Sequence, residues 1–215
     1  MSESPILFSA PMVRATRDGR KSQTRRVVQR TALDWLQSAG FTPEYVAARE
    51  NGLSPYGYAG DRLWVKETFV AYRRWETRCN AKKGRDEWHF IDMTIECDRA
   101  YQYAADDPNV PLAAVRGGVL PGWWRRPSIF MPRAASRITL EVADVRVERL
   151  DAISESDARA EGVTIEEPHK VGYCVGADRP PSIRAFRELW DSLNVERGFG
   201  WQTNPWVWVV EFNHP

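Results

Sequence analysis

The chain has 215 residues, of which 43% are hydrophobic and 12% aromatic, and its net charge is +1. A globular chain of this length buries about 70% of its unfolded surface, so it needs no disulfide or metal to fold. No run of about 18 apolar residues is present, which argues against a membrane span. The first residues also lack the basic start and apolar stretch of a secretory signal. We therefore expect a single cytoplasmic domain over residues 1–215, with no membrane association.

Cysteine and histidine usage gives no sign of a cofactor. The three cysteines are odd in number and lie far apart: Cys79, Cys97 and Cys174. This usage predicts reduced thiols in a cytoplasmic protein. The three histidines share no short ligand spacing with the cysteines: His89, His169 and His214. We therefore expect no zinc site and no other metal or cofactor.

The small net charge conceals two basic segments. Residues 14–30 contain seven basic residues and one acidic residue, and residues 73–85 contain six and one. A solvated basic face is the ordinary explanation of such runs. Tryptophans interleaved with basic segments instead favour a phosphate-bearing partner. We expect a basic cleft that holds a nucleoside or RNA.

The first sixty residues predict one helix and the beginning of a sheet. Ser9 can cap a helix that starts near Ala10 and ends at Gly19 in a left-handed conformation. The chain then turns into a strand that extends to about Val28. Residues 31–60 look irregular, apart from a short helix at about residues 33–38.

A second strand is expected at Arg62–Thr68, and the chain that follows is the least regular part of the sequence. Short strands are expected near residues 88–95 and 100–104, among loops rich in glycine and proline. We interpret residues 70–133 as an irregular insertion that elaborates the domain.

The last third of the chain has the clearest patterns. The apolar alternation of residues 138–150 slips by one position near Ala143, which predicts a strand with a β-bulge. Ser154 begins an S-x-x-D capping box for a helix that ends at Gly162. An amphipathic helix is expected at residues 182–193 and a buried strand at residues 206–212. Three tryptophans on apolar faces are predicted to be core: Trp190, Trp206 and Trp208.

The segment Gly19-Arg20-Lys21-Ser22-Gln23-Thr24-Arg25-Arg26 carries the candidate chemistry. A glycine turn followed by an ammonium, hydroxyls and guanidinium groups suits an oxyanion or a phosphate. The spacing is not that of a Walker loop.

Several motifs together resemble the ASCH domain family and, more narrowly, a bacteriophage and prophage branch of it. They are Ile6-Leu7-Phe8-Ser9, Gly19-Arg20-Lys21, Thr24-Arg25-Arg26, Gly60-Asp61-Arg62-Leu63-Trp64-Val65, Pro127-Ser128-Ile129-Phe130-Met131-Pro132-Arg133 and Ala158-x-Ala160-Glu161-Gly162. The resemblance covers nearly the whole chain for that branch. It implies an α+β fold, a PUA-like and partly closed β-barrel with flanking helices and a long insertion. A phage-encoded protein of this kind would act in the cytoplasm of a bacterial host.

Small bacterial enzymes of this family hydrolyse the amide of N4-acetylcytidine with a Lys and a Thr of a G-R-K-x-x-T motif and a later Glu. The resemblance carries these roles to Lys21, Thr24 and Glu161. Thr24 would be the nucleophile, Lys21 its activator or the cation for the oxyanion, and Glu161 the proton carrier. Residues 21 and 24 point to opposite faces of a regular strand, so the hypothesis requires Lys21 to lie in the turn after Gly19. The alternative is that Lys21 and Thr24 are surface residues of a strand and Glu161 a solvated helix acid.

Five further residues are candidates for binding the substrate: Arg26, Lys66, Glu67, Trp124 and Arg133. Arg26 would position a carbonyl or phosphate. Lys66 and Glu67 follow an apolar strand, and their alternative role is a surface ion pair. The pair Trp123-Trp124 beside two arginines suits base stacking with phosphate contact, and equally a loop that plugs the barrel mouth.

The sequence leaves four functions open. The first is binding of a modified cytidine or RNA with hydrolysis of an N4-acyl amide. The second is a non-catalytic RNA-binding module of the same fold, and the third a metal-independent ribonuclease. The fourth is a phage accessory protein that binds a host protein. The sequence does not decide between nucleoside and polymer, and it does not give the oligomeric state.

Overall fold

The computed structural model describes residues 1–113, 120–166 and 179–214. It is an α+β structure with two sheets and several helices. The chain divides into two compact units, of which the first comprises residues 1–6, 14–64 and 138–215 and the second residues 7–13 and 65–137. Cys174 and His169 lie outside the described residues. Within the described ranges, no helix is long and apolar enough to span a membrane.

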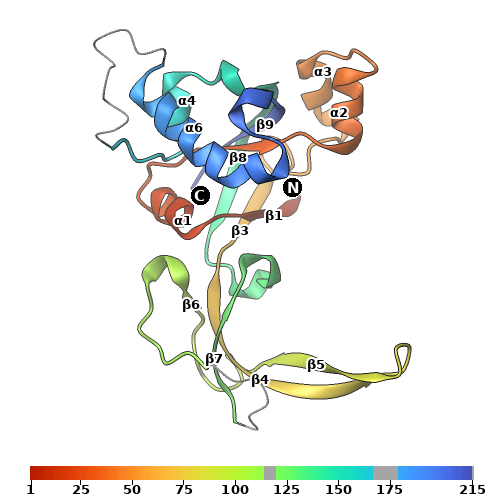
Figure 1. The fold of residues 1–215 in the computed structure, drawn as a ribbon, viewed down its shortest axis with the longest axis vertical. Helices are drawn as coiled ribbons and strands as arrows, with labels where there is room; N and C mark the ends of the chain where they lie inside the picture. Colours follow the sequence, from red (N-terminus) through yellow and green to blue (C-terminus); the bar gives the residue numbers. More distant parts are fainter. Residues whose placement is uncertain (114–119, 167–178, 215) are drawn as a thin grey trace. The chain divides into compact units, whose positions relative to one another are not determined.

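The first unit is built on a five-stranded sheet with the order β1-β3-β8-β9-β2 (Figure 1). Its strands are β1 (Glu3–Leu7), β2 (Gln23–Val27), β3 (Arg62–Lys66), β8 (Thr139–Arg149) and β9 (Trp206–Asn213). β1 and β2 form its two edges, and within the described residues no strand pairing closes the sheet into a barrel.

The central strands β8 and β9 pair antiparallel, and their register slips between Val142 and Asp144. This irregularity confirms the bulge expected near Ala143. The centre of β9 is buried on both faces, as its continuous apolar sequence predicts. Trp208 is core, but Trp206 is only half-buried, with the guanidinium of Arg149 4.3 Å above its ring. The expectation that Trp206 is core was wrong because the residue stands at the first position of its strand.

The helices are α1 (Ala10–Arg17), α2 (Arg30–Gln37), α3 (Pro43–Ala47), α4 (Glu155–Ala160) and α6 (Pro181–Asn194). Residues 31–60, which we expected to be mostly irregular, therefore hold most of α2 and all of α3. Single 3-10 turns lie at Arg49–Asn51, Ala104–Asp106, Ser128–Phe130, Arg133–Ala135, Leu150–Ala152, Val195–Arg197 and Trp201–Thr203.

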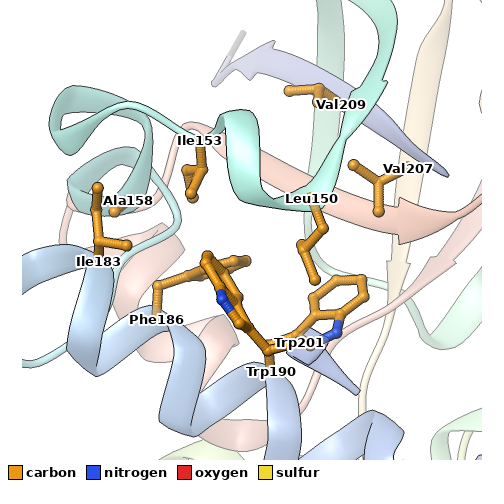
Figure 2. Packing of buried hydrophobic residues seen from close by; sticks show 9 residues of the cluster. All are labelled: Leu150, Ile153, Ala158, Ile183, Phe186, Trp190, Trp201, Val207 and Val209. Atoms are coloured by element: carbon orange, nitrogen blue, oxygen red, sulfur yellow. The ribbon is translucent and has the colours of Figure 1, made fainter. Parts of the chain in front are cut away.

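One face of the first sheet is covered by α4 and α6. Figure 2 shows the apolar cluster between them, which consists of Leu150, Ile153, Ala158, Ile183, Phe186, Trp190, Trp201, Val207 and Val209. Val207 and Val209 come from β9 and the aromatic rings from α6 and the turn before β9. Alternate residues of a strand share a face. Burial of Val207 and Val209 in this cluster therefore fixes which face of β9, and of its partner β2, lies under the helices.

The second unit contains a four-stranded sheet of β4 (Phe69–Asn80), β5 (Arg85–Asp92), β6 (Gln102–Tyr103) and β7 (Gly122–Arg126). β4 is its central strand and pairs with the other three, forming a long hairpin with β5 (Figure 1). The segment we expected to be an irregular insertion thus contains this sheet, and the strands expected near residues 88–95 and 100–104 correspond to β5 and β6. The apolar alternation that predicts a strand is absent from β4, because arginines occupy several of its central positions. Cross-strand ion pairs and ring contacts stabilise it instead of a plain apolar alternation.

Candidate functional site

Lys21 lies in the turn between α1 and β2, outside the regular strand. Gly19 adopts φ +72°, in the left-handed region, and the backbone N–H of Lys21 donates to the carbonyl of Ala15 at 3.0 Å. β2 begins only at Gln23, and Lys21 forms an isolated antiparallel bridge with Glu161. The position that the catalytic hypothesis requires for Lys21 is therefore confirmed.

Lys21 and Glu161 form a buried ion pair, although 140 residues separate them in the sequence. The Lys21 Nζ donates to Glu161 Oε2 at 2.8 Å, to the Glu161 carbonyl at 2.9 Å and to the Gln23 carbonyl at 2.7 Å. The relative exposure of Lys21 is 1% and that of Glu161 is 5%. The alternatives in which Lys21 is a surface residue and Glu161 a solvated helix acid are therefore wrong.

The surroundings of Lys21 act on its pKa in opposite directions. Burial lowers the pKa of Lys21 below its usual value and outweighs the carboxylate of Glu161, which raises it. Arg26 and Arg25 lower it further. An ammonium has three donors, and three acceptors surround this one, a geometry that suits the protonated form. Lys21 is therefore placed to act as a fixed cation rather than as a base.

Arg25 connects the ion pair to a larger network beneath α4. Its guanidinium donates to Glu148 at 2.6 Å and to Asp157 at 3.1 Å, and it reaches Glu161 at 3.4 Å. It also lies 5.8 Å from the ring centroid of Phe186 on α6. Sequence analysis did not select Arg25 as a site residue, because Glu148 and Asp157 are far from it in the sequence. The arginine cluster was the only available signal.

Glu161 is placed by the capping of α4. The hydroxyl of Ser154 accepts from the N–H of Asp157 at 3.1 Å, which confirms the predicted capping box. Glu161 is the C-cap residue, and Gly162 follows with φ +77°. The carboxylate thus lies at the C-terminal end of α4, in contact with the Lys21 ammonium.

Thr24 and Arg26 lie on the other face of β2. Arg25 pairs with Val209, on the side of α4 and α6, whereas Thr24 pairs with Val210. Side chains alternate along a strand, so Thr24 points away from Arg25. Thr24 is buried, and within the described residues its hydroxyl makes no hydrogen bond to Lys21 or Glu161. The predicted triad is therefore assembled only in part: Lys21 with Glu161.

Tyr56 and Arg197 act electrostatically on Arg26, and neither was selected from the sequence. Burial lowers the pKa of Arg26, and the guanidinium of Arg197 lowers it further, while Tyr56 and Glu161 raise it. Burial likewise raises the pKa of the Tyr56 hydroxyl. Two guanidinium groups with a phenol nearby suit an oxyanion such as a phosphate. Glu161 acts on Arg26 as well as on Lys21, so the ion pair influences both faces of β2.

Four of the candidates for substrate binding belong to the second unit. The Lys66 Nζ donates to the carbonyl of Ile129 at 2.6 Å, and Arg133 is exposed in a 3-10 turn. Glu67 is 1% exposed and accepts from Arg137 at 2.9 Å and 3.1 Å, so its alternative as a surface group is wrong. Trp124 stands in β7 rather than in a loop.

Within the described residues, no group of three or more histidine, cysteine, aspartate or glutamate side chains could hold a metal ion. Comparisons of the chain with protein-family models, with curated proteins and with solved structures give no match.

Proposed function

We propose that this chain is an ASCH-like protein with a PUA-like, partly closed barrel that binds a modified cytidine and hydrolyses its N4-acyl amide. The observation that carries the proposal is the buried pair of Lys21 and Glu161 at 2.8 Å. This ion pair joins the segment of Lys21 to that of Glu161, which the sequence analysis had assigned to one site. The bulged β8 supports the barrel, because a bulge bends a strand as a barrel requires.

The proposed reaction divides the work among three residues. The Thr24 hydroxyl attacks the acyl carbon while Glu161 takes its proton and delivers it to the leaving N4 of cytidine. Lys21 holds the carboxylate through their hydrogen bond, and its cation stabilises the oxyanion. Water then hydrolyses the acyl-threonine ester, and cytidine and acetate are released. Arg26, with Arg197 and Tyr56, would hold the oxygen-rich part of the substrate on the face to which Thr24 points.

Thr24 is the residue on which the proposal is most easily tested, because in the described part of the chain its hydroxyl makes no hydrogen bond to Glu161. A nucleophile and its base must come within hydrogen-bond distance when substrate is bound, and such contacts often form only in the complex. We therefore expect Thr24 to approach Glu161 through the bound acyl group.

Release of acetate from N4-acetylcytidine, measured for the wild type, Thr24→Val and Thr24→Ser, tests these roles. Val keeps the shape of the buried side chain without the hydroxyl, whereas Ser keeps the hydroxyl. We expect the Val variant to lose turnover by a factor of about 100 or more and the Ser variant to retain part of it. Undiminished turnover by Thr24→Val would remove Thr24 from the mechanism. Absence of turnover by wild type at nearly stoichiometric enzyme would overturn the proposed activity.

A second function is favoured by one specific observation. The Lys21 Nζ already has three protein acceptors, which suits a structural cation as well as a catalytic one. The chain would then be a non-catalytic module of the same fold that binds a nucleoside. In that case N4-acetylcytidine would bind without acetate release, and Thr24→Val would leave the affinity unchanged.

A further inference from the structure

One face of the sheet in the second unit carries a cluster of aromatic rings from three strands. Phe90 on β5 pairs with Trp75 on β4. Trp88 on β5 and Trp124 on β7 pair with β4 residues that lie two and four positions from Trp75. Even spacing along β4 places all four rings on one face. The ring centroids of Trp75 lie 4.4 Å from Phe90, 6.4 Å from Trp88 and 5.9 Å from Trp124.

This aromatic face is open to solvent at its outer end. Trp88 is 49% exposed. Among the residues that the structure describes, β4 pairs with β5 alone beyond Arg73, and no helix packs extensively on either strand. A tryptophan on a two-stranded ribbon gains little from burial within its own unit. Exposed aromatic patches of this kind mark binding surfaces.

The charge of the second unit selects the chemistry of the partner. Residues 65–137 contain thirteen basic and nine acidic residues, a net charge of +4, whereas the rest of the chain carries −3. On the aromatic face itself, the guanidinium of Arg126 lies 4.5 Å from the ring of Phe90 and 4.3 Å from that of Phe130. A guanidinium stacked on rings can still donate along its edges to phosphate oxygens.

We propose that the face formed by Trp75, Trp88, Phe90 and Trp124 binds single-stranded nucleic acid. Bases stack on Trp88 and its neighbouring rings, and Arg126 contacts the phosphate backbone. Aromatic stacking combined with positive charge is how proteins hold single strands without reading a sequence. A docked protein would account for the rings but not for the guanidinium of Arg126 stacked beside them. The proposal does not depend on the amide hydrolysis proposed above, since it needs no acylated base.

Fluorescence anisotropy with a labelled, unstructured oligouridylate tests the proposal on the whole chain. We expect binding that weakens steeply with added salt. Stacking contributes about 1–3 kcal/mol per base, so Trp88→Ala should weaken binding by about fivefold to about 150-fold, and Trp88→Phe much less. Quenching of tryptophan fluorescence on binding gives a second readout in the wild-type protein.

Tyr45→Ala is the matched control, because Tyr45 is 47% exposed on α3 in the first unit. It should bind oligouridylate as the wild type does. A fully paired RNA duplex should bind more weakly than the single strand, because its bases cannot stack on the rings. Equal affinities of the Trp88→Ala and wild-type proteins would overturn the proposal. Absence of oligouridylate binding at low salt would also overturn the proposal and would favour a protein as the partner of this face.

Discussion

Gly162 packs directly against Lys21. A Cβ at residue 162 would lie 2.8 Å from the Cβ of Lys21 and 2.9 Å from that of Ala15, distances that side chains do not tolerate. Gly162 also has φ +77°, a conformation that costs other residues free energy. The glycine after Glu161 is therefore required by the close approach of α4 to the lysine turn.

Gly162→Ala should lower the free energy of unfolding by more than backbone strain alone. Gly198→Ala is the matched control, because Gly198 has φ +80° and a Cβ there would meet nothing within 4 Å. We expect the control to lose about 1–2 kcal/mol and Gly162→Ala to lose at least about 1 kcal/mol more. Urea unfolding of both variants measures the difference. Equal losses would show that the turn adjusts without cost.

The buried ion pair should be strongly coupled in stability. Removing one charge leaves the other buried without its partner, so Lys21→Met and Glu161→Met should each lower the free energy of unfolding by about 3–5 kcal/mol. The double variant should lose much less than the sum, because it leaves neither charge unpaired. Denaturant unfolding of the four proteins gives the coupling energy.

An exposed ion pair on α4 provides the control for that cycle. Arg159 and Glu155 are in contact at 2.5 Å, with side chains that are 61% and 41% exposed. Arg159→Ala should change the free energy of unfolding by about 0.5 kcal/mol or less. Additive losses at Lys21 and Glu161 would mean that the pair behaves like this exposed one.

Asp61 should make the stability of the first unit depend on pH in the acid range. The backbone N–H of Ser2, at 2.7 Å, lowers the pKa of Asp61, and the N–H of Tyr58 and the guanidinium of Arg49 lower it further. Because the folded pKa is lowered, the contribution is complete above the unfolded pKa of about 3.9 and is lost as pH falls through the folded pKa.

Asp61→Asn isolates this contribution. The variant should be less stable than the wild type at pH 7, and the difference should shrink as the pH falls towards about 2. Thermal unfolding of both proteins across this range measures it. A difference that stays constant with pH would show that the carboxylate charge does not hold the N-terminal strand.

Local patterns predicted much of the first unit correctly. The capping box at Ser154, the left-handed Gly19, the helix end at Gly162 and the bulge near Ala143 depend on neighbouring residues and were readable directly. The pattern of β4 was not readable in this way. Arg73 is almost fully buried there, paired with Asp92 on β5 and packed over Phe90, so a charged residue occupies a core position.

The sequence by itself determined the turn that holds Lys21, the helix that ends at Glu161 and the segregation of basic residues, because caps, turns and charge are short-range properties. Only the tertiary structure decided that Lys21 and Glu161 are buried together, that Arg25 joins their network and that Thr24 lies on the opposite face. These facts depend on which strand pairs with β2 and which helices cover it. Such long-range contacts follow from burial of the whole apolar surface, which no local pattern records.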